Sequence, residues 1–304
     1  PKYDEGSKIQ HTTRVRSLQR VKVARVNTMK KLFALYVIAI IAVVIGTTTA
    51  RAGTIAHWTF EEGTPGATAS GVGTIIDSSA NNLHGTALGG PVYQDGLKSG
   101  TGNTGLNFDG NNDTVHVSSG STGPLALAGD FTIELGVRAD IPNALGFGVF
   151  YGDTQPSKDP YFIFMDGNGK LTFQIYGGAT TASLQTANGA LQIGKTTQIA
   201  AVFDYDDIDG SNNIMSIYVD RMLVVDLDIG TTVPFYGDTT SDFWIGSVHD
   251  NGNPGRYFRG GLTDVKISDS ALTGSEMMLV PEPGMMAIFG VGLLALGLTR
   301  RKRS

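Results

Sequence analysis

Apolar residues recur at every second position through the middle of this chain, and this period restricts the class of fold more than any other feature. It is clearest in residues 131–138, 171–176 and 215–220. In the first of these segments the apolar positions are Phe131, Ile133, Leu135 and Val137. A period of two is typical of strands with one face in a core and the other in water, and it therefore predicts antiparallel sheets.

Further segments are rich in apolar and β-branched residues, and Gly-rich or Asn-rich turns separate them. They are residues 54–60, 105–109, 113–118, 146–151, 160–165, 197–204, 222–228, 242–247 and 258–268. The stretch from Asp166 to Gly169 lies between two of them and is typical of a hairpin turn. Thr273 and Glu276 have the spacing of a capping box, which predicts a short turn of helix before the linker to the C-terminal tail. So many short strands predict one all-β domain over residues 53–279, an antiparallel sandwich or jelly roll.

The charge is divided unevenly along the chain. Of 23 Lys and Arg residues, ten lie in residues 1–52 and four in residues 300–303, whereas 26 of the 28 Asp and Glu residues lie between these ends. The nine remaining basic residues leave this central part with a formal charge near −17. Such a charge argues against nucleic acid or an anionic membrane as the partner of the domain, since both attract positive charge. The absence of Cys excludes disulfides, zinc–thiolate sites and thiol catalysis.

The C-terminal 25 residues consist of three parts in a fixed order. First comes the tripeptide Pro281, Glu282, Pro283, then an apolar run over residues 285–298, and last the basic cluster Arg300, Arg301, Lys302, Arg303. This order resembles the PEP-CTERM sorting signal of exported bacterial proteins, and the resemblance implies cleavage near the tripeptide by a membrane protease of the exosortase type. The alternative is a plain C-terminal membrane anchor with a basic flank. In both interpretations a short transmembrane helix holds the chain at the membrane before processing, and the body of the protein lies outside the cytoplasm.

The N-terminal region has the features of a secretory signal peptide over residues 29–52. Met29 opens a charged segment, residues 32–45 form an apolar run, and Ala50 and Ala52 form an A-x-A cleavage site. The apolar run is short and ends in small residues, which favours a signal helix over a membrane span. Residues 1–28 precede this start and are interpreted as translated upstream sequence or an extended n-region, expected to be disordered.

Six short segments of the central part occur in a characteristic order. They are residues 55–61, 77–85, 106–115, 131–134, 217–220 and 260–267, followed by Ala271, Leu272 and Glu276. Together they resemble the LamG-like concanavalin A-type jelly roll, the lectin/glucanase sandwich, over residues 54–279. The resemblance implies a concave sheet that can bind sugars and a structural calcium ion near the loops that join the first strands to the last.

Hard oxygen ligands suited to such an ion occur in the Gly-rich and Asn-rich turns. The candidates are Asp77, Asn82, Asp109, Asp113 and Asp264. The alternative is that these side chains stabilise turns by bonding to their own backbone. A second acidic stretch, residues 204–213, lies between two predicted strands and lacks the closing Glu of an EF-hand, so it is interpreted as a solvated hairpin loop.

The sequence lacks the residue pattern of a glycoside hydrolase. Retaining enzymes need two carboxylates about 5 Å apart, and in glucanases of this fold both lie on one strand. Glu134 has no second acid two or four positions later, and Glu61 and Glu62 are neighbours that point to opposite faces of a strand. No nucleophile-elbow motif G-x-S-x-G is present either. The prediction is a protein that is not an enzyme.

Aromatic residues are the candidates for stacking on sugar rings. They are Tyr151, Tyr161, Tyr176, Tyr236, Trp244 and Tyr257. Trp58 and Trp244 lie in apolar strands and are expected in the core, whereas Tyr176 is on the polar face of its strand. The histidines His57, His84, His116 and His249 lack metal-binding spacing and are expected in turns or on sheet surfaces.

These observations predict an exported surface or extracellular-matrix protein that is not catalytic. Its sandwich would bind carbohydrate, with extracellular polysaccharide as a partner beside the sorting protease. The alternative from another class is a purely structural matrix protein without a sugar site, and a glycoside hydrolase of the same fold is the remaining one.

Overall fold

The computed structural model describes most of the central part of the chain. The described residues are 52–97, 104–119, 123–127, 129–141, 146–152, 160–166, 168–177, 180–205, 212–231, 242–250 and 253–278. All of them belong to one compact unit, which begins at Ala52. The predicted signal helix, the cleavage residue Ala50 and the whole C-terminal tail lie outside the described residues, whereas Ala52 lies inside.

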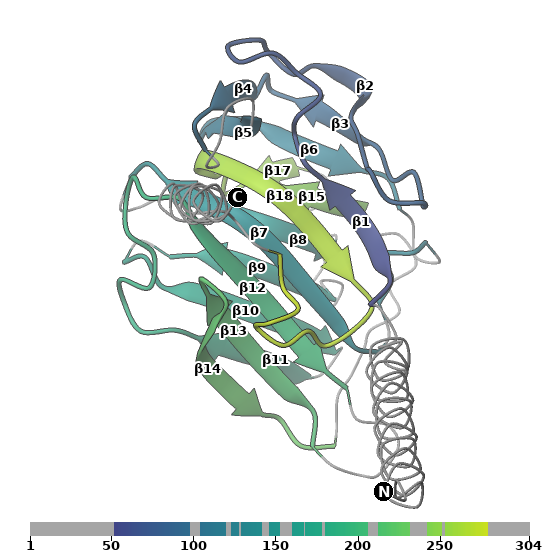
Figure 1. Cartoon of the computed structure of the whole chain (residues 1–304), viewed down its shortest axis with the longest axis vertical. Helices are drawn as coiled ribbons and strands as arrows, with labels where there is room; N and C mark the ends of the chain where they lie inside the picture. The colour runs from purple at the N-terminus through teal and green to yellow at the C-terminus, as the bar shows by residue number, and fades with distance from the viewer. Residues whose placement is uncertain are drawn as a thin grey trace, which may run out of the picture. The chain divides into compact units, whose positions relative to one another are not determined.

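Two antiparallel sheets make up the fold, and we call the first sheet A (Figure 1). Its strands, from one edge to the other, are β14 (Met222–Asp228), β13 (Ile214–Val219), β12 (Thr197–Asp204), β7 (Phe131–Ala139), β18 (Arg259–Ser268), β5 (Thr104–Asp109) and β4 (Val92–Asp95). The first strand of the domain, β1 (Thr54–Trp58), also pairs with β18, which is the last strand. The two ends of the domain are therefore joined within sheet A.

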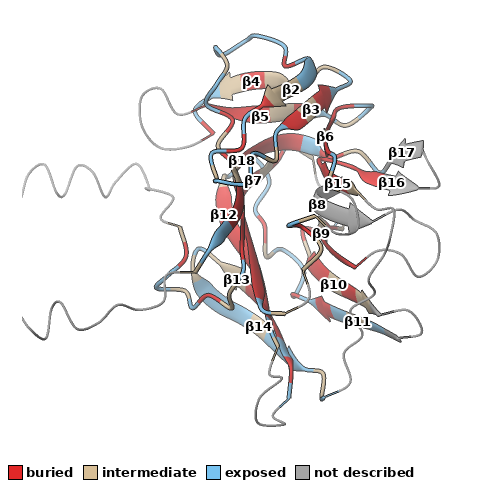
Figure 2. Ribbon diagram, turned by 90° about the vertical axis from the view of Figure 1, so that its right-hand side faces the viewer, coloured by how far each residue is buried: buried red, intermediate tan, exposed pale blue. Residues whose placement is uncertain are grey.

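The second sheet, sheet B, also has eight strands. In order they are β11 (Thr180–Gln185), β10 (Leu171–Gly177), β9 (Tyr161–Met165), β8 (Gly146–Gly152), β15 (Asp242–Ile245), β6 (Thr114–Val117), β3 (Gly85–Leu88) and β2 (Gly71–Ile75). A separate short hairpin, β16 (Val248–Asp250) and β17 (Asn253–Gly255), follows β15. In the side view of Figure 2 the strands of the two sheets form two layers, with buried residues concentrated on the facing strands.

The core fills the space between the two sheets. The apolar series predicted from residues 131–138 lies in this core with the inward residues of both sheets, as the sequence predicted. Trp58 of sheet A is fully buried and stacks on Phe243 of sheet B, with ring centroids 5.3 Å apart. Its indole Nε1 donates a hydrogen bond to the carbonyl of Leu83 at 2.8 Å, which satisfies the polar atom of a buried ring.

Every segment predicted to be a strand is a strand, and the all-β antiparallel class is confirmed. The sequence analysis missed β2, β3, β4, β11 and the hairpin β16–β17, which are short, glycine-rich or polar. The turn at Asp166 is the predicted hairpin turn between β9 and β10, closed by a bond from the Gly169 amide to the Asp166 carbonyl.

The short helical turn predicted at Thr273 forms as a single hydrogen-bonded turn, in which the amides of Glu276 and Met277 donate to the Thr273 carbonyl at 2.9 and 3.3 Å. The capping contact also forms, because the Thr273 amide donates to Oε2 of Glu276 at 2.9 Å. The segment ends after this turn, and the described residues contain no helix at all. Residues on either side of this turn, Leu272 and Met278, are bonded to β7 of sheet A.

The outer face of sheet A departs from the prediction that the polar face of each strand meets water. Thr132 and Glu134 of β7 point away from the core, yet both are fully buried. Residues 269–278, which follow β18 and which we call the C-terminal strap, lie across β7 and β12 (Figure 1). Strand β14, at the edge of sheet A, is in contrast exposed along nearly its whole length (Figure 2).

Candidate functional site

Sheet B presents a continuous row of paired positions on its outer face. The row consists, in order across the sheet, of Thr86, His116 and Trp244, then the paired position on β8, and then Phe162, Gln174 and Ser183. Neighbouring positions on each strand, such as Val115, Phe243, Ile163 and Phe173, belong to the core. Because side chains alternate along a strand, the row lies on the opposite face, directed away from sheet A. Directly paired side chains on one face lie about 5 Å apart, close enough to form one surface.

A histidine fixed in one orientation, His116 of β6, lies on this face. The ring of His116 stacks on Trp244, with centroids 4.3 Å apart and planes inclined by 26°. Its Nε2 is 2.8 Å from Oδ2 of Asp242, while the amide of Ser119 donates to the other carboxylate oxygen at 3.1 Å. The side chains of His116 and Asp242 are 26% and 30% exposed. They therefore present an imidazole edge and a carboxylate to solvent in a defined geometry.

A cluster of buried aromatic and apolar residues packs beside His116. Phe162, Trp244 and Val248 are buried together, and Phe164 is half-buried against them. The predicted burial of Trp244 is confirmed, but the indole lies on the outer face of sheet B instead of between the sheets. Val248 of the short strand β16 is part of the cover, so Trp244 supports the surface and is not itself the exposed ring.

Polar side chains continue the face toward the edge strand β11. Gln174 and Tyr176 of β10 are half-buried, and Ser183 and Gln185 of β11 are exposed. Tyr176 thus lies on the polar face of its strand, as predicted. Lys170, in the turn before β10, donates to Oε1 of Gln185 at 3.1 Å. Amide and hydroxyl groups at this spacing can exchange hydrogen bonds with the hydroxyl groups of a ligand.

The strands of sheet B carry almost no charge. Within their described sequences Asp242 is the one carboxylate, and they contain no Lys or Arg. The face is therefore nearly neutral in a domain whose total charge is strongly negative. A neutral surface of aromatic and amide groups binds by stacking and hydrogen bonding more than by ion pairing.

The predicted calcium ligand Asp77 is fully engaged in hydrogen bonds to protein groups. One oxygen accepts from the amides of His57 and Ser79 at 2.9 and 2.8 Å. The other accepts from the Ser79 hydroxyl at 2.6 Å and from the Leu83 amide at 2.8 Å. Burial acts to raise the pKa of Asp77, but these hydrogen bonds outweigh it and hold the pKa below its ordinary value. The side chain thus fixes the turn between β2 and β3.

The other four candidates are distributed over three places. Asn82 is exposed, with φ of 54°, in the turn that Asp77 closes. Asp109 accepts from the Asn111 amide and side chain, and Asp113 accepts from the Asp109 amide at 2.9 Å. Oδ1 of Asp264 is 3.4 Å from Nε2 of His57. Among the described residues, no three His, Asp or Glu side chains come together to hold a metal ion. The calcium site stays a prediction, and backbone carbonyls would have to supply much of its coordination.

The remaining aromatic and histidine candidates divide between core, turn and undescribed positions. Tyr161 is fully buried and its hydroxyl donates to the Leu125 carbonyl at 2.9 Å. Nδ1 of His84 accepts a hydrogen bond from the Asp77 amide at 3.1 Å, so this side chain stabilises the turn between β2 and β3. Tyr257 is half-buried. The side chains of Tyr151 and His249, and Tyr236 altogether, lie outside the described part.

Asp242, Phe162 and Phe164 are functional candidates that the sequence analysis did not single out. The sequence does contain a signal for the two phenylalanines. All five residues of 161–165 are apolar, whereas a strand with one face in water would alternate apolar and polar residues, so both faces of this strand are expected to be covered. Asp242 has no comparable local signal, since it reaches His116 only through the pairing of β15 with β6.

Two family models match the chain. The first, described as the concanavalin A-like lectin/glucanases superfamily, matches residues 109–278. The chain belongs to this superfamily. The match contains the described strands from β6 to β18 together with the C-terminal strap, and so it contains most of sheet B.

The second model is the PEP-CTERM protein-sorting motif, which matches residues 279–303. It includes every predicted sorting residue, from Pro281 to Arg303, and it begins directly after the strap. The motif marks the chain as an exported, envelope-associated protein. Over the described residues, no helix is long and apolar enough to cross a membrane.

Several solved structures resemble the chain. Domain 4 of AbnA, an extracellular GH43 arabinanase from Geobacillus stearothermophilus in complex with arabinotriose, is 15% identical with a TM-score of 0.49, over 74% of this chain and 97% of that domain. The CBM40 of the Ruminococcus gnavus IT-sialidase, bound to α2,3-sialyllactose, is 16% identical with a TM-score of 0.43, over 54% and 92%. The receptor-binding domain of botulinum neurotoxin type G is 14% identical with a TM-score of 0.46, over 74% and 49%. No curated protein sequence matches the chain.

Proposed function

We propose that this exported protein binds carbohydrate on the outer face of sheet B and does not catalyse a reaction. The observation that carries the proposal is the row of aromatic and amide side chains across β6, β15, β9 and β10, with His116 held between Trp244 and Asp242. Membership of a superfamily described by lectins and glucanases agrees with a sugar as the ligand.

The physical fit rests on the two kinds of surface that a pyranose ring presents. Its C–H face packs on flat apolar or aromatic groups, and its hydroxyl groups exchange hydrogen bonds with amides and carboxylates. Phe164 and Tyr176 are half-buried and supply the first kind, while Gln174, Gln185 and Asp242 supply the second. Because strand pairing fixes their backbone positions, little ordering accompanies binding.

The distribution of carboxylates supports a role without catalysis. Hydrolysis of a glycosidic bond needs two carboxyl groups, about 5 Å apart in retaining enzymes and about 6.5–9.5 Å apart in inverting ones. The described strands of sheet B offer Asp242 alone, and its two oxygens contact His116 and the Ser119 amide. Glu134, the acid tested in the sequence analysis, lies on the outer face of sheet A and contacts Lys266 and the Met278 amide.

The absence of basic residues from the described strands of sheet B favours neutral over anionic polysaccharides. An acidic sugar would approach a domain of strongly negative charge and would meet Asp242 without a cation on these strands. The carboxylates of the sugar and of Asp242 would repel each other, so uronic acid polymers are expected to bind poorly.

The test is thermal melting of the full chain in detergent, with and without soluble polysaccharides. Neutral polymers such as laminarin and xylan are compared with alginate, which is anionic. A ligand at 100 times its Kd stabilises the fold by about 2.7 kcal/mol, which shifts Tm by several degrees. Gln174→Ala should weaken a neutral ligand about fivefold through the loss of one hydrogen bond.

The matched control is Gln94→Ala, the same change at a half-buried position on sheet A. It should leave sugar affinity unchanged. A response to alginate alone would contradict the neutral-ligand proposal. A flat response to every polymer would reject the sugar site and favour a purely structural role in the matrix.

Calcium is a second, independent proposal for the same protein. The turns that hold Asp77 and Asp109 join the early strands to the rest of the sandwich, which is where the family resemblance implies an ion. If an ion is held there, Ca²⁺ should raise Tm and EDTA should lower it. The variant Asp109→Ala should abolish the difference between the two conditions.

A further inference from the structure

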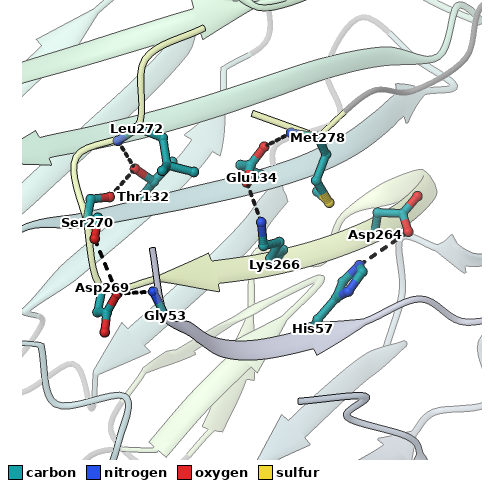
Figure 3. A network of polar contacts seen from close by, with 10 residues as sticks. All are labelled: Gly53, His57, Thr132, Glu134, Asp264, Lys266, Asp269, Ser270, Leu272 and Met278. Atoms are coloured by element: carbon teal, nitrogen blue, oxygen red, sulfur yellow. Dashed lines mark hydrogen bonds and ion pairs between the residues drawn. The ribbon is translucent and has the colours of Figure 1, made fainter. Parts of the chain in front are cut away.

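The C-terminal strap is bonded at both of its ends, residues 269 and 278, and at points between them; Figure 3 shows the contacts of Asp269, Ser270, Leu272 and Met278. At its start, Oδ1 of Asp269 accepts from the amide of Gly53 at 2.6 Å, and the Asp269 amide donates to the Gly53 carbonyl at 3.0 Å. The strap is thereby tied to the residue before β1. Two strands that are far apart in sequence, β1 and β18, share this end of the domain.

The first crossing point is Thr132 on β7. Its hydroxyl donates to the Ser270 carbonyl at 2.6 Å and accepts from the Leu272 amide at 2.9 Å. A single fully buried side chain thus satisfies a backbone acceptor and a backbone donor of the strap. This explains why a Thr on the outward side of β7 is buried.

The middle of the strap is held at the turn between β13 and β14. Nε of Arg221 donates to the Gly274 carbonyl at 2.6 Å, and a second guanidinium nitrogen donates to the Ser275 carbonyl at 3.0 Å. A Cβ on Gly274 would clash with the Arg221 carbonyl oxygen, so the strap approaches this turn as closely as glycine permits. Arg221 has φ of 67°, a left-handed conformation that is unfavourable for a residue with a Cβ, and the surrounding contacts maintain it.

The last bond of the strap is made by Glu134. Its Oε1 accepts from the Met278 amide at 2.6 Å, and its Oε2 is 3.4 Å from Nζ of Lys266. Leu272 and Met277 complete the attachment by burying their side chains against Ala200 and Val202 of β12. The strap, which the sequence analysis placed inside the domain of residues 53–279, is therefore an integral part of the fold.

Only two residues, Leu279 and Val280, separate the last bonded residue from Pro281 of the sorting motif. Two residues of extended chain span at most about 7 Å. A protease that reads a peptide binds it in an extended form and so contacts several residues on each side of the bond it cleaves. On the N-terminal side of Pro281, those residues include Met277 and Met278, which the sheet already holds.

We propose that the strap is a latch, and that release of residues 277 and 278 from sheet A limits the processing of the tail. The inference does not rest on the sugar site, because it uses only the strap, sheet A and the sorting motif. Binding of the protease and binding of Glu134 compete for the same two residues. Export would then deliver a folded domain whose tail is processed only when the latch opens.

The test measures processing of the full chain by pulse-chase labelling in a bacterium that carries an exosortase. The main variant inserts a Gly/Ser spacer of six residues between Met278 and Leu279, which leaves every bond of the strap intact. Met278→Pro removes the amide that Glu134 binds, because proline has no N–H. Met278→Pro should raise the rate of processing about fivefold, the factor expected from one lost hydrogen bond. The spacer variant should raise it at least as much, because it moves the sorting motif away from the bonded residues.

The control variant is Asp77→Asn, which weakens another buried carboxylate that holds backbone amides, away from the strap. It should destabilise the fold without raising the rate of processing. Hydrogen exchange should show faster opening of residues 276–278 in Met278→Pro and no change in the spacer variant. Equal processing of all four proteins, including no processing of any, would overturn the proposal, and so would slower processing of the spacer variant.

Discussion

The two outer faces of this sandwich are both partly buried, but by different means. On sheet A, the strap covers β7 and β12, and the cover is held by polar side chains, chiefly Thr132 and Glu134. On sheet B, the face is covered locally by its own aromatic residues and by Val248 of the short hairpin. The first face is closed by a segment bonded at both ends and at points between them, whereas the second keeps His116, Asp242 and β11 accessible.

This difference assigns separate tasks to the two faces. Sheet A is bonded to the strap that precedes the sorting motif. A change at Glu134 therefore acts directly on Met278, the last described residue of the strap. A face with half-buried aromatic and amide groups can receive an external ligand without unfolding anything. Sheet A is accordingly the processing face in our proposals, and sheet B is the binding face.

The largest effect should come from removing the support of sheet B. Trp244→Ala should destabilise the fold by about 3–5 kcal/mol, the range for a buried aromatic truncated to Ala, because Phe162, Val248 and the His116 ring lose their common contact. Denaturant unfolding of the full chain measures it. Trp244→Phe, the control, keeps a ring and should lose much less. A loss of stability under about 1 kcal/mol for Trp244→Ala would mean that the indole does not support sheet B. It would contradict the statement that the aromatic residues of sheet B cover its outer face.

The next effect concerns the clamp of sheet A. Glu134→Ala leaves the Lys266 ammonium without its carboxylate and the Met278 amide without an acceptor. The expected loss is about 2–3 kcal/mol, because one half-buried charge and one part-buried donor remain unpaired. Denaturant unfolding measures this loss. The double variant Glu134→Ala, Lys266→Met should recover part of the stability. No recovery would show that the ammonium is solvated and that the clamp acts through Met278 alone.

The smallest effect concerns Asp77, which fixes the turn between β2 and β3 and lies outside both outer faces. The pKa of Asp77 is lowered on folding, so its contribution is fully present above the ordinary value of 3.8 and is lost as the pH falls through the lower folded value. Asp77→Asn should therefore cost about 1–2 kcal/mol at pH 7, and the difference from the wild type should shrink below pH 3.8. Urea unfolding at pH 7 and pH 3 measures it. A difference that stays constant with pH would mean that the hydrogen bonds of Asp77 do not need its charge.

The sequence predicted the strands well where apolar residues alternate, because burial of one face in a core leaves that period. It missed β3 and β11, whose sequences GTAL and TTASLQ contain few large apolar residues. It also predicted that Glu134 faces water, since alternation reports only that a residue is opposite the core. What covers that opposite side is a matter of chain path, and local sequence carries no record of it.

The sorting residues and the family could be recognised from the sequence because both depend on the order of residues along the chain. The candidate site on sheet B could not, because His116 and Asp242 are 126 positions apart and meet only through strand pairing. Trp244 was correctly predicted to be buried but was placed in the wrong layer, since two buried environments of similar polarity give a strand the same composition.

The sequence alone determined the all-β class and the sorting motif, because a period of two and a terminal motif are local properties of the chain. Only the tertiary structure decided which outer face is closed and which is accessible. The physical reason is that Thr132, Glu134 and Arg221 act on backbone groups of a strap that follows them by 53 to 144 positions. Backbone groups are the same in every residue, so their partners are set by the fold and not by the sequence around them.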